Sequence, residues 1–336
     1  MICDATLLLA RVWERLAARL GPVVMTPPTT LDWHSFIHNW RAREVPTWAS
    51  LGAQSTAASI EMAIAELLAE RVSPGRGLET FRKVASWAKK NCDDLLESLA
   101  SMKIAECQMI NNKSPLRARS FAERAIAILE SKAQRRTGRS RRRAKILGSA
   151  HYYLAAALRR MGRIKAAIRH SKQGLRWYRG AKYRRGLAVS SIALALCNQE
   201  LMLRAPNRVE HSRRWRIATR EFKRALDILA RTGDKGNEAS CLNSLGQFRA
   251  IYSARDRTEW QAGIDNLNEA LQLARKIDNG NIVISCHVNL AEAYKNTDPE
   301  TACEHLKEAG LDPERLKARG LRKQVRALRL HLGCRA

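Results

Sequence analysis

Apolar positions recur along most of this chain at the spacing of an amphipathic helix. Between residues 151 and 175 the apolar and small positions are Leu154, Ala155, Leu158, Gly162, Ala167, Ser171, Gly174 and Leu175. Because residues three and four apart share one face of a helix, this pattern predicts two helices joined by a glycine turn at Gly162. Strand-like runs of Val, Ile and Thr are rare. We therefore expect an all-α protein.

The pattern returns along the chain as an internal repeat. Further first helices begin at Leu245–Gly246 and Leu290–Ala291, and second-helix patterns occur around Ala118–Ala122 and Ala218–Phe222. From Ala225 to Ala270 is 45 residues and from Ala270 to Ala309 is 39, both longer than a standard tetratricopeptide repeat of 34. The large-small pairs, the turn and the small second-helix residues resemble the tetratricopeptide repeat (TPR) family in its long-helix bacterial variant, best over residues 115–310.

The resemblance implies an α-solenoid, a right-handed superhelix of TPR-like antiparallel helix pairs. We expect pairs at 55–90, 93–131, 142–180, 185–232, 236–277 and 281–310, and a basic capping helix at 313–332. The predicted organisation is a lead-in helix with a Pro- and Trp-rich segment at 1–50, weakly repeat-like pairs at 51–131, the repeat array with a basic centre at 132–310, and the C-terminal capping helix at 311–336.

Positive charge is concentrated in the middle of the chain. The formal net charge is +28, and residues 111–185 alone hold 23 basic and two acidic residues. No acidic residue occurs between residues 131 and 199, whereas residues 233–312 carry 13 acidic and eight basic side chains. A concentrated cationic region favours nucleic acid or an acidic protein surface as a partner.

Two basic segments could form such a surface. The stretch 133–145, AQRRTGRSRRRAK, contains the turn formers Thr137, Gly138 and Ser140, so it predicts a loop, either a solvated connector or a grip on a polyanion. The next second helix, 162–179, places five cations four, three, four and three residues apart, within about 80° of one another. Like charges at this spacing destabilise a helix slightly, and a bound polyanion would reverse that effect.

The predicted nucleic-acid surface covers residues 132–185 and 204–224. Its cations are Arg135, Arg136, Arg139, Arg141, Arg142, Arg143, Lys145, Lys165, Arg169, Lys172, Arg176, Arg179, Lys182, Arg184, Arg185, Arg213, Arg214 and Arg216. Three aromatic residues mixed among them are either base-stacking candidates or core residues: Trp177, Tyr183 and Trp215. RNA or single strands are favoured over duplex DNA, because no groove-reading helix-turn-helix is evident.

The resemblance also implies a concave groove lined by the first helices, in which family members hold extended peptides through Asn and Lys side chains. The aligned groove positions are Tyr152, Tyr153, Arg159, Arg160, Asn243, Gln247 and Asn289. The alternative hypothesis is therefore a peptide- or protein-binding regulator, whose groove or basic region docks an acidic partner.

Catalytic and metal-binding patterns are lacking in the sequence. His34 and His38 are four apart, but no third ligand of known spacing accompanies them, and no phosphate-binding glycine loop or GxSxG sequence occurs. We expect no enzyme activity, cofactor or metal. The eight cysteines form no CxxC pair, and several lie on apolar helix faces, which predicts reduced, buried thiols in a cytoplasmic protein. No transmembrane segment is expected.

These patterns lead to two hypotheses. The first is a non-enzymatic scaffold that binds nucleic acid through its basic centre, as an accessory of a larger nucleoprotein complex with other protein subunits. The second is the protein-binding regulator. The two hypotheses differ in the partner that meets the basic region.

Overall fold

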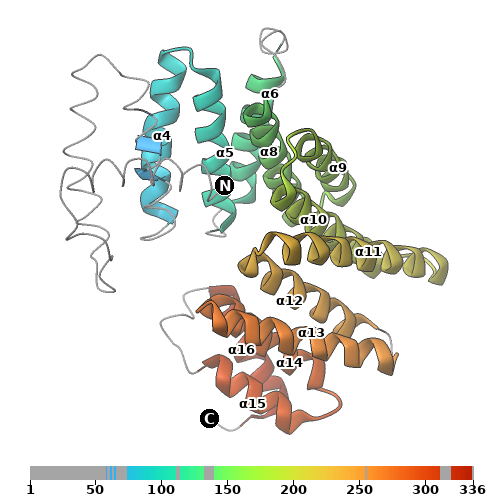
Figure 1. Cartoon of the computed structure of the whole chain (residues 1–336). Coiled ribbons are helices and arrows are strands. Elements are labelled where there is room, and N and C mark those ends of the chain that lie inside the picture. The colour runs from blue at the N-terminus through green and yellow to red at the C-terminus, as the bar shows by residue number, and fades with distance from the viewer. Residues whose placement is uncertain are drawn as a thin grey trace. The chain divides into compact units, whose positions relative to one another are not determined.

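The computed structural model describes residues 58, 61, 62, 64, 65, 74–110, 114–131, 140–253, 256–310 and 319–334. Twelve helices and no strand occur within these residues (Figure 1), so the all-α prediction is confirmed. Two compact units are present, residues 1–161 and residues 162–336. The predicted lead-in segment 1–50 lies outside the described residues.

The first unit contains the helices α4 (Pro74–Lys90), α5 (Asp94–Ile110), α6 (Pro115–Glu130) and α8 (Arg141–Arg160). Phe81 and Ile104 are fully buried in a core that α4 and α5 share. Helix α6 starts where the sequence supplies a cap: the Ser114 hydroxyl accepts a hydrogen bond from the backbone N–H of Arg117, and Pro115 occupies the first turn.

The second unit contains eight helices in its described residues. They are α9 (Ile164–Gly180), α10 (Arg184–Leu203), α11 (Arg208–Thr232), α12 (Lys235–Tyr252), α13 (Arg257–Lys276), α14 (Gly280–Tyr294), α15 (Pro299–Gly310) and α16 (Arg319–Leu332). The predicted pairs 185–232, 236–277 and 281–310 match α10–α11, α12–α13 and α14–α15 to within one residue. Helix α16 lies within the predicted cap.

Small residues bring the two helices of a pair close together. A Cβ atom added to Gly246 of α12 would lie 2.7 Å from Leu267 Cγ and 2.8 Å from the carbonyl oxygen of Gly263 on α13. A Cβ atom added to Gly263 would lie 2.4 Å from the backbone nitrogen of Ala250. All three distances are shorter than real Cβ contacts, so this crossing requires glycine on each side. The repeat pattern therefore reflects backbone-to-backbone packing.

Glycine also occupies two of the turns between helices, one of them predicted from the sequence. Gly162 has φ +74° between α8 and α9, and Gly233 has φ +66° between α11 and α12. L-residues with a side chain rarely adopt this left-handed conformation, whereas glycine does so readily. The predicted turn at Gly162 is confirmed.

Helix α10 is long and apolar enough to cross a membrane, judged by length and composition among the described residues. The fold accounts for its composition, because 61% of its most apolar window is buried inside the protein. Ala188, Ala195 and Met202 belong to the core that it shares with α11 and α12. We therefore interpret α10 as a core helix.

Candidate docking surface

Helix α9 presents a row of five basic side chains. The buried side of the helix includes Ile164, Ala167, Ser171 and Tyr178. The exposed residues Lys165, Arg169, Lys172, Arg176 and Arg179 form what we call the α9 row. None of the five forms an ion pair with a residue that the structure describes. The row is about 21 Å long at 1.5 Å per residue, so an acidic partner would meet five cations in succession.

The ring of Tyr178 packs α9 closely against Gly186 of α10. A Cβ atom added to Gly186 of α10 would lie 2.4 Å from Tyr178 Cδ1, and the ring centroids of Tyr178 and Tyr183 are 5.4 Å apart. Tyr183 therefore packs beside a buried ring, and part of its surface is already covered. Trp177 is half-buried. Of these two stacking candidates, Trp177 is the better placed for a ligand beside the α9 row.

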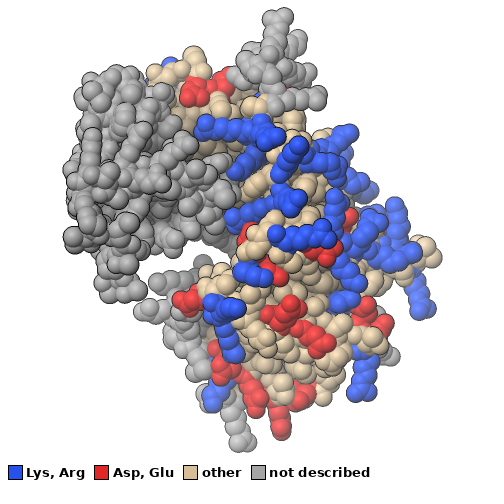
Figure 2. Space-filling model, viewed as in Figure 1, with Lys and Arg blue, Asp and Glu red and all other residues tan. Residues whose placement is uncertain are grey.

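Helix α11 carries the second basic surface. It borders a shallow, open depression of about 440 Å³, which we call the α11 groove. The described residues that line it all belong to α11: Trp215, Arg216, Thr219, Arg220, Lys223, Arg224 and Asp227. Figure 2 shows basic side chains gathered over α9 and α11, and more frequent acidic side chains over the helices that follow in the second unit.

Trp215 is mainly a packing residue at the edge of this groove. Its ring stacks on the buried ring of Phe248, with centroids 4.3 Å apart and planes inclined by 27°. One face of the indole is thus occupied by the protein itself. As a platform for a base, Trp215 offers at most its other face.

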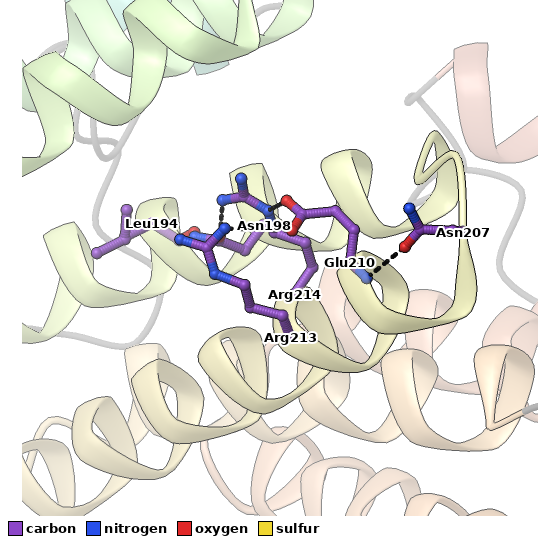
Figure 3. Close-up of polar contacts among 6 residues, drawn as sticks. All are labelled: Leu194, Asn198, Asn207, Glu210, Arg213 and Arg214. Atoms are coloured by element: carbon purple, nitrogen blue, oxygen red, sulfur yellow. Dashed lines mark hydrogen bonds and ion pairs between the residues drawn. The ribbon is translucent and has the colours of Figure 1, made fainter.

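One of the predicted ligand cations, Arg214, instead holds α11 to α10, and a second, Arg213, shares the Glu210 carboxylate with it (Figure 3). Arg214 donates to the amide oxygen of Asn198 over 3.0 Å and to Glu210 over 2.6 Å. Arg213 donates to the same carboxylate over 3.2 Å. Hydrogen bonds from Arg214 and Arg213 lower the pKa of Glu210. Arg214 is therefore committed to the fold, and Arg213 is partly neutralised.

Other predicted cations divide into paired and exposed groups. Arg185 forms an ion pair with Asp234 at 2.7 Å, and Lys145 is half-buried. Arg135, Arg136 and Arg139 lie outside the described residues. Apart from Arg143, the remaining predicted cations are exposed: Arg141 and Arg142 at the start of α8, Lys182 and Arg184 around the α9–α10 turn, and Arg216 in the α11 groove.

Arg143 does not fit the expected role of a surface cation. It is 9% exposed, and its guanidinium donates to the backbone carbonyl of Leu129 at the end of α6. The last carbonyls of a helix lack partners within the helix, and a cation there also meets the negative end of the helix dipole. Arg143 thus fastens α8 to α6, and only Arg141 and Arg142 of this triplet remain for a ligand.

The predicted groove amides on α12 and α14 bind each other. Gln247 donates to Asn289 over 2.9 Å, Asn289 donates to Asn243 over 2.9 Å, and Asn243 donates to Ser285 over 3.1 Å. Asn289 is only 5% exposed. These three hydrogen bonds stabilise the contact between α12 and α14. The amide groups that were expected to bind a peptide therefore already have partners within the protein.

The groove positions on α8 are likewise partly engaged. Tyr152 and Tyr153 pack edge to face with centroids 5.0 Å apart, and burial raises the pKa of Tyr152. Arg160 donates to the carbonyl of Met109 over 2.9 Å, and Arg159 is half-buried. Arg160 thus joins α8 to α5 through this bond although the residue is exposed, and Tyr152, Tyr153 and Arg159 are half-buried.

A histidine pair, His287 buried and His305 half-buried, lies where α13, α14 and α15 meet. His287 Nδ1 and His305 Nδ1 are 3.1 Å apart, and Arg275 Nη2 lies 3.3 Å from His287 Nε2. Because a guanidinium can only donate, Nε2 of His287 accepts, and its ring proton on Nδ1 is donated to His305. Burial, together with His305 and Arg275, lowers the pKa of His287 to about 4. Burial also lowers the pKa of His305, so both rings of the pair are neutral near pH 7.

The cysteines correct one expectation. Cys303 of α15 and Cys334 after α16 form a disulfide, with Cα atoms 5.5 Å apart. Cys107, Cys197, Cys241 and Cys286 are buried free thiols, as expected, but Cys92 is exposed. Their sequence positions gave no sign of the disulfide, since its partners are 31 residues apart. The described residues contain no cluster of three metal-ligating side chains, and His34 and His38 lie outside them.

Four charged residues of the α11 groove were not singled out in the sequence. Arg220, Lys223 and Arg224 fall inside the basic segment 204–224, and Asp227 lies just beyond it. The available signal was the spacing of Arg216, Arg220 and Arg224 at intervals of four, which places them along one side of a helix.

No family model and no curated protein sequence matches this chain. Among solved structures, a Rap protein complexed with Competence and Sporulation Factor is similar over 98% of this chain and 94% of that chain, with a TM-score of 0.58 and 12% identity. The apo form of RapI is similar over 75% of this chain and 81% of that chain, with a TM-score of 0.54 and 12% identity. Aspartyl phosphate phosphatase F from Bacillus subtilis is similar over 82% of this chain and 70% of that chain, with a TM-score of 0.53 and 12% identity.

These likenesses concern the fold. Together with the helix pairs and the glycine crossing, they define an all-α protein of TPR-like helical repeats. The resemblance predicted from the sequence is confirmed at this level.

Proposed function

We propose that this protein is a non-enzymatic helical-repeat scaffold that docks an acidic protein partner on its second unit. The observation that carries the proposal is the α9 row, with five exposed cations and no ion pair to a described residue. Ordinary surface helices intersperse acids that pair with their cations. A partner's carboxylates would replace the mutual repulsion of the row by attraction, which raises the association rate and fixes orientation.

The comparison with solved structures supports a protein partner. The Rap structure that is similar over nearly the whole chain holds a bound Competence and Sporulation Factor, so this fold is compatible with a docking role. Catalysis receives no support from the residues described above. The cytoplasmic location predicted from the sequence belongs to this proposal, and the Cys303–Cys334 disulfide is the observation that opposes it, since disulfides persist mainly in oxidising compartments.

The proposal is tested with the purified full chain and a fluorescent, helical Glu-rich peptide. In fluorescence anisotropy, Lys165→Gln, Arg169→Gln and Lys172→Gln together should weaken binding about tenfold, because three adjacent exposed pairs contribute up to about 1 kcal/mol each. The matched control replaces the same residue types on α13 and α15: Arg257→Gln, Lys276→Gln and Lys307→Gln. Equal losses in the two triple variants would show attraction to net charge alone, and would contradict the proposal.

Single-stranded nucleic acid, bound by an accessory of a nucleoprotein complex, is the second candidate. It is favoured by the half-buried Trp177 at the end of an acid-free cationic row, because single-strand binders combine such rows with stacking platforms. An oligouridine of the same net charge as the peptide distinguishes the two. The second candidate requires tighter binding of the oligonucleotide and a log-log salt slope that falls by about 2 in the α9 triple variant.

A further inference from the structure

The α11 groove differs from the α9 row because its charges are mixed. It contains four cations, Arg216, Arg220, Lys223 and Arg224, together with Asp227. The buried carboxylate of Glu221 lies 3.6 Å from Arg220 and 3.9 Å from Arg224. Arg216, Lys223 and Asp227 form no ion pair with a described residue.

The helix that carries the groove, α11, is anchored to the core on its opposite side. On the opposite side of α11, Ala218, Phe222, Ala225 and Leu229 are completely buried in the core of the second unit. The clamp between Arg214 and Asn198 fixes the N-terminal half of the helix. The cations of the groove are thus presented by a helix that is packed against the core along its opposite side.

The spacing of the groove matches a helix. Arg216, Arg220 and Arg224 are four residues apart, which corresponds to steps of about 6 Å along α11. A second helix lying along α11 repeats its own side chains at the same interval, so acids at every fourth position would face these cations. Trp215 at one end offers its free indole surface to an apolar side chain of that helix.

Asp227 argues for protein over nucleic acid in this groove. It is exposed at the end opposite Trp215, where a phosphate backbone that followed the groove would meet a repelling carboxylate. A protein helix can instead place one Lys or Arg there. The acid then fixes the register of the partner, as complementary charges do at interfaces.

We propose that the α11 groove docks an amphipathic acidic helix of a protein partner, aligned by a basic residue that faces Asp227. The inference rests on the proposed docking function and names the shape of the partner. In this arrangement the partner's acids face Arg216, Arg220, Lys223 and Arg224, and an apolar residue covers Trp215.

The experiment uses the full chain and a stapled helical peptide with one Leu, three Glu at intervals of four, and one Lys in sequence along one face. A second peptide has Glu in place of that Lys. The wild-type protein should bind the Lys peptide about threefold more tightly, and Asp227→Lys should reverse the preference, since each exposed pair is worth up to about 1 kcal/mol.

Two double variants separate this inference from the proposed function. Arg216→Gln with Lys223→Gln should weaken the Lys peptide about fivefold, whereas Lys165→Gln with Lys172→Gln on α9 should change its affinity less. The inference fails if only the α9 variant matters, although the docking function then stands. If neither double variant changes the affinity, both are overturned. A groove variant that weakens oligouridine more than the peptide would assign the groove to nucleic acid.

Discussion

Arg214 of α11 donates its guanidinium N–H to the amide oxygen of Asn198 on α10, over 3.0 Å. The Asn198 side chain is 2% exposed, and its Nδ2 donates to the carbonyl of Leu194 over 2.8 Å. Both polar atoms of this buried amide therefore have a hydrogen-bond partner: the nitrogen bonds within α10, and the oxygen accepts from α11. Arg214, which the charge pattern of the sequence assigns to a binding surface, instead links α10 and α11 by a hydrogen bond.

Replacing Arg214 should therefore destabilise the fold. Arg214→Ala leaves the buried oxygen of Asn198 without its partner, which costs about 1–3 kcal/mol, and urea denaturation followed by circular dichroism should show the loss. Arg216→Ala, two residues along the same helix and exposed, should stay within about 0.5 kcal/mol of wild type. Similar losses for the two variants would mean that the clamp contributes nothing specific.

The glycine crossing between α12 and α13 gives a second prediction. Gly246→Ala should lower the free energy of unfolding by about 1–3 kcal/mol, because the new methyl group would overlap Leu267 and the Gly263 backbone. Gly236, in the same helix, has no atom within 4 Å of an added Cβ, so Gly236→Ala should be neutral or slightly stabilising. Thermal unfolding of both variants tests this difference, and a tolerated Gly246→Ala would show that the crossing can widen.

The histidine pair predicts a loss of stability in acid. The pKa of His287 falls from 6.5 to about 4 in the folded chain, so between these values the unfolded chain binds a proton that the folded chain does not. The free energy of unfolding should consequently fall as pH falls from 6.5 to 4, by about 2 kcal/mol after allowance for solvent screening. His287→Gln should flatten this part of the pH profile. The exposed His331→Gln should not, and an unchanged slope in His287→Gln would assign the acid sensitivity elsewhere.

The sequence predicted what depends on local periodicity. Helix bounds, the turn at Gly162 and the α9 row all follow from spacings within one or two turns of helix, where the direction of a side chain is set by its position. The α11 groove was predicted only in part. The sequence shows the i,i+4 spacing of its arginines, but it does not show which charged side chains are exposed and which form ion pairs.

Contacts between distant residues explain what was missed. Arg143 reaches Leu129 across a gap of 14 residues, and Arg214 reaches Asn198 across 16. Which arginine meets a carbonyl or an amide depends on how two helices cross, and net charge does not encode that. The same holds for His287 and His305, which are 18 residues apart and meet only because α14 packs on α15.

The disulfide supplies the last prediction, since it contradicts the expectation of reduced cysteines. Cys303 and Cys334 join α15 to the end of α16, closing a loop with a sequence separation of 31. Closing a loop of that length restricts the unfolded chain and stabilises the fold by about 3–4 kcal/mol in the chain-entropy description. Thiol titration of the denatured protein should find two fewer reactive cysteines before reduction than after it.

Cys303→Ser should lower the melting temperature, because α16 then rests on α14 and α15 only through apolar contacts such as those of Val325 and Leu328. The exposed free thiol Cys92 provides the control, because Cys92→Ser removes a sulfur without removing a cross-link. If the same number of thiols reacts with and without reductant, the cysteines are reduced as the sequence predicts. In that case α16 is held by its apolar face alone, and the cytoplasmic location loses its main opposing observation.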